Sequence, residues 1–162
     1  MNKNQNDLKK LWDLIKHLEV ALLTTTEPDG TLHTRPMAAM QTDFDGNLWF
    51  FTEAASHKVD EIHHHPQVNV TYVDAVKNRY IAVSGKAYVV RDRAKARTLW
   101  LPFLRAWFPN GVDSPEIALL RIQVEKVEYW ESPSSKSVGL LGFTITTTTI
   151  PSADSHTLAI SH

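Results

Sequence analysis

The sequence predicts a mainly β domain, a small antiparallel barrel with a few peripheral helices. Three observations favour this class. At least six stretches are rich in β-branched or aromatic residues, tight turns join most of them, and 162 residues with 43% hydrophobic composition suffice for one core. Strands that follow one another through tight turns pair antiparallel, and closing them into a barrel removes exposed edges. A closed barrel is therefore favoured over an open sheet.

The N-terminal part predicts one helix followed by three antiparallel strands. Apolar residues recur at helical spacing from Leu8 to Leu18, with Asn6 or Asp7 available as the N-cap. Two β-rich stretches, Val20 to Thr26 and Thr31 to Met40, flank a Pro-Asp-Gly turn and are expected to form a hairpin. An Asp-Gly turn then leads into a third strand, LWFFT, whose aromatic residues suit burial on both faces.

The second half adds helices between further strands. Ser56 is expected to cap a short helix that a proline ends, and the alternating segment VNVTYV predicts a fourth strand. Tyr80 to Val90 predicts either one strand bent at Gly85 or two strands that meet there, because a glycine within a strand usually marks a bulge or a barrel corner. A helix starting at Asp92 and a long strand from Ile117 to Glu131 follow.

The domain organisation is expected to be simple, with one domain over residues 1–143 and a tail over residues 144–162. There is no internal repeat and no long linker. The tail is rich in threonine and lacks an amphipathic pattern, so it predicts at most one late strand and then a mobile end.

Composition excludes several classes of function. The sequence has no cysteine, which removes disulfides, thiolate metal sites, iron–sulfur clusters and cysteine nucleophiles. A net charge of −1 gives no sign of a nucleic-acid partner. The polar N-terminus lacks the apolar core of a signal peptide, and no stretch approaches the ~20 apolar residues of a membrane span. We therefore expect a soluble, cytoplasmic protein with no membrane or nucleic-acid partner.

Arg35 is the first candidate functional residue. On the alternating second strand it shares a face with His33 and Met37, and the neighbouring Pro36 gives up a backbone donor that a central strand would use. Arg35 is then either a surface arginine on an exposed strand face or a charge that requires a partner. The sequence pattern leaves both open.

The segment Ser56-His57-Lys58 is the second candidate, at the start of a predicted helix. Free backbone N–H groups and the helix dipole favour an anion there, although an ordinary serine cap with a solvated lysine is the preferred explanation of this segment taken alone. Together with Arg35, however, two cations and a helix N-terminus would meet, and their repulsion predicts a bound anion such as a phosphate.

Five short motifs follow one another between the predicted N-terminal helix and about Trp130. They are Arg35-Pro36-Met37, Trp49-Phe50-Phe51-Thr52, Ser56 with Lys58 before a helix ending in His-Pro, Phe108-Pro109-Asn110-Gly111 and Glu128-Tyr129-Trp130-Glu131. In these motifs the sequence resembles the FMN-binding split barrels related to pyridoxamine 5′-phosphate oxidase, and among them the general stress protein 26-like group. The resemblance implies an antiparallel split β-barrel of Greek-key type that forms a homodimer, with FMN, or FAD, at the interface.

The resemblance also implies roles for individual residues. Arg35, Ser56 and Lys58 would hold the flavin phosphate; Pro36, Met37 and Ala38 would border the ring system; Phe51 and Thr52 would line the cleft; and Trp130 would reach the flavin from the partner subunit. His57 stands where the oxidases tend to have a second basic residue, and it could become charged at mildly acid pH. The oxidases' arginine-rich C-terminal segment has no counterpart after Trp130, so pyridoxamine-phosphate oxidation is not expected.

Two further features are weighed as possible sites. The run His63-His64-His65 invites a metal-site interpretation, but consecutive helical histidines point in different directions, so solvation at the helix end is preferred and no metal is expected. A cluster of aromatic and apolar residues could cover a ring-shaped ligand, although such clusters are more often core or dimer interface. Its members are Trp100, Phe103, Leu104, Trp107 and Phe108.

Two functions follow from the resemblance. The first is flavin-dependent oxidoreductase activity on a small-molecule substrate that the sequence does not identify, with no side chain required as general acid or base. The second is a flavin-binding stress protein without turnover, serving as a sensor or a store. Hydrolase, NTPase and glycosidase chemistry have no motif in the sequence.

Overall fold

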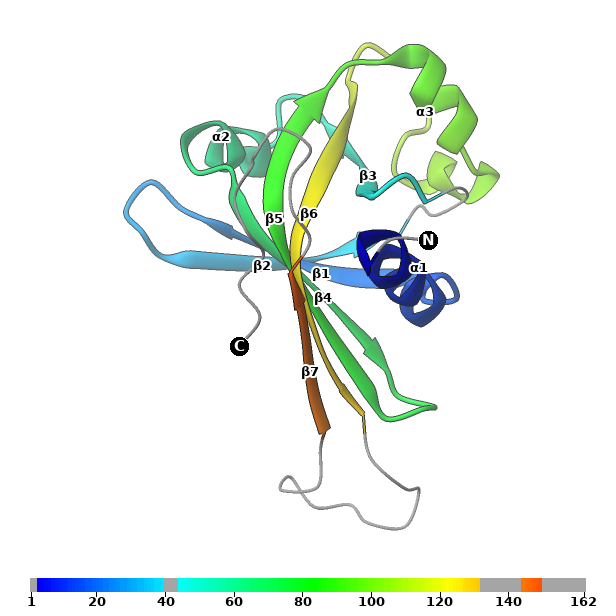
Figure 1. Cartoon of the computed structure of the whole chain (residues 1–162). Helices are drawn as coiled ribbons and strands as arrows, with labels where there is room; N and C mark the ends of the chain where they lie inside the picture. Colours follow the sequence, from blue (N-terminus) through cyan, green and yellow to red (C-terminus); the bar gives the residue numbers. More distant parts are fainter. Residues whose placement is uncertain (1–2, 40–43, 132–143, 150–162) are drawn as a thin grey trace.

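The computed structural model describes residues 3–39, 44–131 and 144–149 (Figure 1). The helices and strands are, in chain order, α1 (Lys3–Ile15), β1 (Val20–Thr26), β2 (Leu32–Ala38), β3 (Asn47–Glu53), α2 (His57–His64), β4 (Gln67–Asp74), β5 (Arg79–Val90), α3 (Arg93–Leu99), the 3-10 helix η1 (Pro102–Ala106), β6 (Ile117–Glu131) and β7 (Thr144–Thr149). The first and third predicted strands, the long final strand and the helices lie close to where the sequence places them. Helix α1 begins earlier than expected, so Asn6 and Asp7 lie within it rather than cap it.

All strands of the described part belong to one antiparallel sheet. The order along the sheet is β2-β1-β4-β5-β6-β3, and β7 pairs with the C-terminal part of β6. Strands β5 and β6 are long and run through the middle of the curled sheet (Figure 1). Among the described residues no ladder joins β2 to β3, so the sheet forms a curled, split barrel in which these two strands lie at the ends of the path. The expected strand in the tail is present as β7, and residues 150–162 lie outside the described part.

The bend in β5 occurs at Gly85, as one strand with a bulge. The register with β6 shifts between Ser84 and Gly85, which confirms the first of the two alternatives for this segment. A Cβ atom on Gly85 would collide with the carbonyl oxygen of Gln123 and lie 3.0 Å from its carbonyl carbon. Because both atoms belong to the backbone of the neighbouring strand, only glycine fits here.

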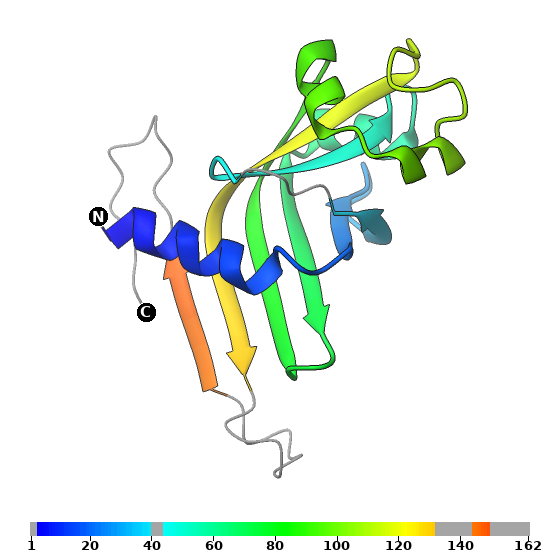
Figure 2. The same ribbon diagram turned by 90° about the vertical axis from the view of Figure 1, so that its right-hand side faces the viewer.

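Two apolar clusters fill the space on either side of the sheet. In the larger one, Leu11, Leu14 and Ile15 of α1 pack against strand residues such as Tyr72 and Ile81, and Figure 2 shows α1 lying across the sheet. The second cluster lies where α3 and η1 meet β3 and β6. Its buried members are Trp49, Phe51, Ala96, Leu99, Leu104, Ile117 and Leu119. Strand β3 is thus buried on both faces, as its aromatic sequence predicts.

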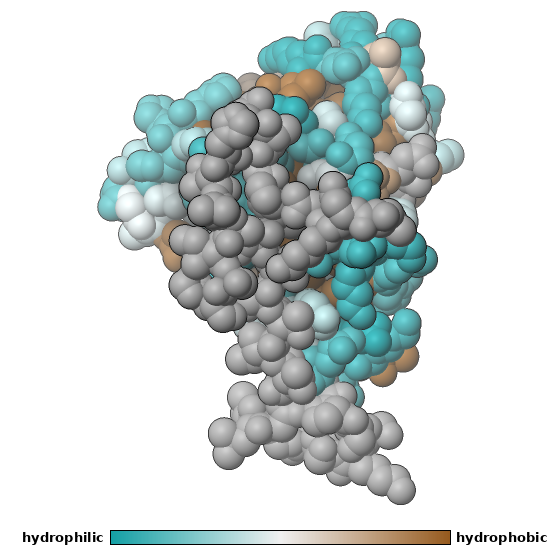
Figure 3. All heavy atoms as spheres, viewed as in Figure 1, coloured by the Kyte–Doolittle hydropathy of each residue, from teal (hydrophilic) through white to brown (hydrophobic). Residues whose placement is uncertain are grey.

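The described surface is mostly hydrophilic in the view of Figure 3, with hydrophobic residues visible only in small areas. Within the described residues, no helix is both long and apolar enough to cross a membrane.

Candidate functional site

A cavity of about 430 Å³ opens where β1, β2 and β3 meet the start of α2 and the segment around η1. We call it the Lys58 cavity. It is lined by Val20, Arg35, Pro36, Met37, Ala38, Phe51, Thr52, Glu53, Lys58, Leu104, Trp107 and Phe108. Seven of the ten site residues expected from the sequence are in this lining. Its volume lies within the range of roughly 300–1,000 Å³ that is typical of small-molecule sites.

The polar end of the cavity is built around Lys58. Its ammonium group donates a hydrogen bond to Thr52 Oγ1 at 3.2 Å, and Ser56 Oγ lies 3.2 Å from the same hydroxyl. Burial lowers the pKa of Lys58, and the positive charge of Arg35 lowers it further. No carboxylate among the described residues lies within ion-pair distance of this ammonium group. The cavity therefore contains a half-buried cation that a bound anion would stabilise.

Ser56 holds the position expected of it, as the N-cap of α2, but its side chain does not cap the helix. The hydroxyl instead contacts Thr52 at the end of β3. This contact ties the start of α2 to the strand that lines the cavity. The positive end of the helix dipole is consequently beside Lys58, where it also favours an anion.

Arg35 already has a counter-ion that sequence reasoning missed. Its Nη2 donates to Glu61 Oε2 at 2.7 Å, and Nη1 donates to Thr25 Oγ1. Glu61 is completely buried, and Thr25 Oγ1 donates a very short hydrogen bond to the same carboxylate oxygen. Burial raises the pKa of Glu61, but the hydrogen bonds from Thr25, Arg35 and His33 outweigh this effect and lower it to about 2. The pair is therefore ionised at neutral pH.

The sequence does contain one signal for Glu61. It follows Lys58 by three residues on α2, and residues at this spacing share a helix face. Its partner is Arg35, 26 residues earlier, and that pairing depends on how α2 packs against β1 and β2. Arg35 is thus neither a solvated surface arginine nor a free cation, since its side chain is only 13% exposed.

Aromatic side chains form the apolar wall of the cavity. Phe51 contacts Trp100 edge to face, with ring centroids 5.6 Å apart, and lies 6.2 Å from the ring of Phe108. Trp107 also lines the cavity and is 62% exposed. The segment Pro36–Ala38 of β2 belongs to the same lining. A planar ring system could be held between these surfaces. Members of the aromatic cluster seen in the sequence pack in the second apolar cluster, which agrees with the core alternative, and some also line the cavity. Their contact with a ring-shaped ligand stays a prediction.

Three of the expected site residues do not line this cavity: Ser56, described above, His57 and Trp130. His57 is directed towards carboxylates, with its Nε2 3.0 Å from Glu27 Oε2, so its role at a phosphate stays a prediction. Trp130 lies near the C-terminal end of β6, where it pairs in register with Tyr80 of β5. Its expected contact is with a flavin held by a second subunit, and this too stays a prediction.

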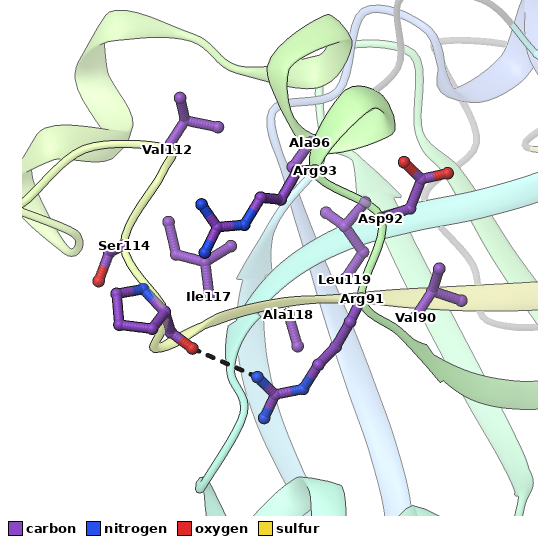
Figure 4. Close-up of a pocket in the computed structure, with 11 residues that line it drawn as sticks. Val90, Arg91, Asp92, Arg93, Ala96, Val112, Ser114, Ile117, Ala118 and Leu119 are labelled. Carbon is purple, nitrogen blue, oxygen red and sulfur yellow. Dashed lines mark hydrogen bonds between the residues drawn. The ribbon is translucent and has the colours of Figure 1, made fainter.

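One further cavity adjoins the Lys58 cavity, and a smaller one shares no lining residue with it. One of about 590 Å³ shares Val20, Ala38 and Trp107 with it and extends towards the end of α1. The other, of about 130 Å³, lies between the start of α3 and the segment before β6, where Arg91 donates to the carbonyl of Pro115 at 3.3 Å (Figure 4). This arginine-lined cavity is too small for a large planar cofactor and contains none of the expected residues.

The sequence matches the family described as "Pyridoxamine 5'-phosphate oxidase like" over residues 6–154. The chain belongs to this family. The split β-barrel and the order of motifs across it agree with that membership, so the resemblance noted in the sequence is confirmed.

Individual relatives and similar solved structures were also found. The protein bli-3 of Neurospora crassa is 28% identical over 119 residues, which cover 67% of this chain and 57% of that protein, so the chain spans little more than half of its relative. The general stress FMN/FAD binding protein from Xanthomonas citri is 27% identical, with 84% of this chain and 96% of that chain covered at a TM-score of 0.69.

A third similar structure shows the fold alone. It is a protein from Clostridium acetobutylicum that is related to general stress protein 26 of B. subtilis. The identity is 18%, the TM-score is 0.71, and the alignment covers 90% of this chain and 96% of that chain.

Proposed function

We propose that this chain binds FMN, or FAD, in the Lys58 cavity, with the flavin phosphate at its polar end. The observation that carries the proposal is Lys58 itself, a half-buried ammonium group without a carboxylate partner among the described residues, beside the start of α2. The description of the Xanthomonas citri protein as FMN/FAD binding supports the choice of ligand.

The residues of the cavity fit a flavin. Lys58 and the hydroxyl of Ser56 are expected to bind the phosphate, and Arg35 has five N–H donors, so its pair with Glu61 leaves donors for a phosphate oxygen. Pro36, Met37 and Ala38 would border the ring system from one side, and Phe51 and Thr52 from the other. The bound flavin would supply hydride or one-electron transfer, while the protein positions it and adjusts its electrostatic surroundings.

We also propose that the functional unit is a homodimer with the flavin at the interface. Strand β1 exposes Val20 by 57% and Leu22 by 39%, and Val20 lines the Lys58 cavity. Apolar side chains next to a ligand cavity are typical of a surface that a partner covers. Trp130 of the partner subunit would then contact the flavin. Leu22→Glu is expected to convert the dimer to monomers in light scattering.

The activity we propose is a flavin-dependent oxidoreductase on a small-molecule substrate. The cavity of about 590 Å³ that adjoins the Lys58 cavity supports it, because it would leave room for a substrate beside the ring system. The second candidate is a flavin-binding protein without turnover. It is favoured by the sequence after Trp130, which carries no arginine to hold a substrate phosphate. In both cases we expect the protein to act in the cytoplasm.

Flavin titration tests the binding proposal. Purified protein should take up FMN at micromolar concentrations with quenched flavin fluorescence, and the double variant Arg35→Ala/Lys58→Ala should bind it more weakly. Arg93→Ala, in the arginine-lined cavity of Figure 4, is the matched control and should bind FMN as the wild type does. A wild-type protein that takes up no flavin would contradict the proposal, whereas unchanged binding in the double variant would contradict only the phosphate assignment.

Reduction kinetics then separate the two candidates. If the flavin-loaded protein is reduced by NADH or NADPH faster than free FMN, and passes electrons to an acceptor, the oxidoreductase is supported. If it is not, the protein binds flavin without turnover under these conditions, and the second candidate is preferred.

A further inference from the structure

Four side chains that could bind a metal ion lie close together near Arg35, and none of them lines the Lys58 cavity. Glu27 follows β1, His33 lies on β2, and His57 and Glu61 lie one helical turn apart on α2. The sequence gives no spacing signal for this group, because the hairpin and the helix bring its members together from three separate segments. The run His63-His64-His65, which does attract attention in the sequence, is not part of it.

Four nitrogen–oxygen distances within this group are close to the spacing between ligands of a tetrahedral metal ion. His33 Nδ1 lies 3.4 Å from Glu27 Oε1 and 3.3 Å from Glu61 Oε1. His57 Nε2 lies 3.0 Å from Glu27 Oε2 and 3.4 Å from Glu61 Oε1. Nitrogen and oxygen atoms bound to a tetrahedral Zn²⁺ at about 2.0–2.1 Å lie about 3.3–3.4 Å from one another. Three of the four distances are longer than an ordinary N–H···O hydrogen bond, which spans about 2.7–3.2 Å.

The surroundings of Glu61 orient it for this role. Arg35 and Thr25 both hold Oε2, which leaves Oε1 facing the two histidines. Such hydrogen bonds to the second oxygen of a carboxylate are the usual support behind a metal ligand. Arg35 Nη2 also lies 2.8 Å from His33 Nδ1, and because a guanidinium N–H can only donate, this contact uses the lone pair of Nδ1. A metal ion bound by His33 would replace this one contact of Arg35.

The group is accessible from solvent on one side and closed on the other. His57 is 64% exposed and His33 is 50% exposed, whereas Glu27 is 26% exposed and Glu61 is completely buried. An ion could therefore enter past the histidines and meet the carboxylates behind them. Two imidazoles and two carboxylates form a donor set suited to Zn²⁺, since neutral imidazole and carboxylate both bind it well.

We propose that Glu27, His33, His57 and Glu61 bind one divalent transition-metal ion, Zn²⁺ or an ion of similar preference. Glu27, His57 and Glu61 form the core of the site, with ligand atoms that all lie within 4.8 Å of one another. His33, whose Nδ1 lies 3.4 Å from Glu27 Oε1 and 3.3 Å from Glu61 Oε1, is the fourth ligand. This site is separate from the proposed flavin site and does not depend on it.

The test uses the full chain without a histidine tag, freed of metal with a chelator. Zn²⁺ is titrated in competition with a chromogenic chelator, and Co²⁺ is used as a spectroscopic probe, because a tetrahedral Co²⁺ site absorbs visible light strongly. We expect one Zn²⁺ per chain and a tetrahedral Co²⁺ spectrum. Glu27→Gln and His57→Gln, both at partly or largely exposed positions, should each weaken Zn²⁺ binding by about tenfold or more.

The control is the triple variant His63→Gln/His64→Gln/His65→Gln, which removes the other histidine cluster. It should bind Zn²⁺ as the wild type does. Thermal unfolding without metal shows whether each variant remains folded. Absence of saturable uptake by the wild type would overturn the proposal. So would a loss of binding in the triple variant together with unchanged binding in Glu27→Gln and His57→Gln, because the ion would then be bound at the end of α2.

Discussion

Replacing Lys58 by glutamine tests the placement of the flavin phosphate most directly. The substitution shortens the side chain by one atom and keeps a hydrogen-bond donor, but it removes the positive charge that lacks a carboxylate partner among the described residues. A hydrogen bond to a charged group contributes about 1.5–3 kcal/mol, which corresponds to a loss of FMN affinity of roughly 10- to 150-fold. Riboflavin has the same ring system without the phosphate, so its affinity should change little.

The assay is titration of each flavin by fluorescence quenching, with dissociation constants compared between wild type and variant. Lys77→Gln serves as the matched control, because it removes one charge from an exposed lysine in the turn between β4 and β5. Only the combination of Lys58→Gln with FMN should show the large loss. If FMN and riboflavin lose affinity equally, or if neither does, Lys58 does not contact the phosphate and the orientation of the flavin proposed above is wrong.

Three further predictions concern the stability of the fold. Glu61→Gln should lower the free energy of unfolding by about 3–5 kcal/mol, because it removes the completely buried carboxylate that pairs with Arg35, itself only 13% exposed. Asp60→Asn, at an exposed neighbour, should cost less than about 1 kcal/mol. Equal losses in urea denaturation would contradict a stabilising role of this pair. Gly85→Ala should lower the free energy of unfolding by about 3 kcal/mol or more, because its Cβ would collide with the backbone of β6. Gly30→Ala should lower it by about 1–2 kcal/mol, because φ is +89° there but the space is open. A larger loss for Gly30→Ala would contradict the close approach at the bulge. Burial raises the pKa of Asp74, but hydrogen bonds from a histidine and a backbone N–H outweigh this and lower it below 3.8. The stabilisation from ionised Asp74 is present above pH 3.8 and is lost as the pH falls through the pKa of the folded state. Asp74→Asn should therefore flatten the acid side of a curve of unfolding free energy against pH. An unchanged curve would show that Asp74 does not contribute.

Much of the fold could be predicted because its strands have regular patterns and clear turns. The boundaries of β1 and β6 agree with the sequence prediction, and both predicted turns contain a glycine with positive φ, Gly30 and Gly46. The predicted run of three antiparallel strands is wrong at its third member, because β3 pairs with β6 and, among the described residues, not with β2. The start of α1 was less accurate, because the residues before Leu8 are polar and fit a helix interior as well as a cap. The closed barrel that the strand pattern favours is wrong for the described residues, in which no ladder joins β2 to β3. Closure depends on how far the long strands β5 and β6 curl, which the local pattern does not determine.

The lining of the Lys58 cavity was predictable where the residues lie on strands or at a helix start. Arg35, Phe51 and Lys58 are of this kind, and local pattern with family resemblance was sufficient to select them. Leu104 and Trp107 come from the irregular segment around η1, where the sequence shows an aromatic cluster but no period that fixes its direction. Their place in the cavity follows from how this segment folds back onto β3.

Glu61 changes how the arginine of β2 is understood. The sequence suggested that Arg35 and Lys58 are two cations that both require a bound anion, yet the carboxylate of Glu61 already balances Arg35. The unbalanced charge is therefore that of Lys58, and the affinity for a phosphate should depend on Lys58 more than on Arg35. Arg35 then has a second function, because it holds one oxygen of Glu61 and thereby orients the other towards His33 and His57. The same ion pair positions the two neighbouring sites, so its loss should disturb both, whereas loss of Lys58 should disturb only the flavin site.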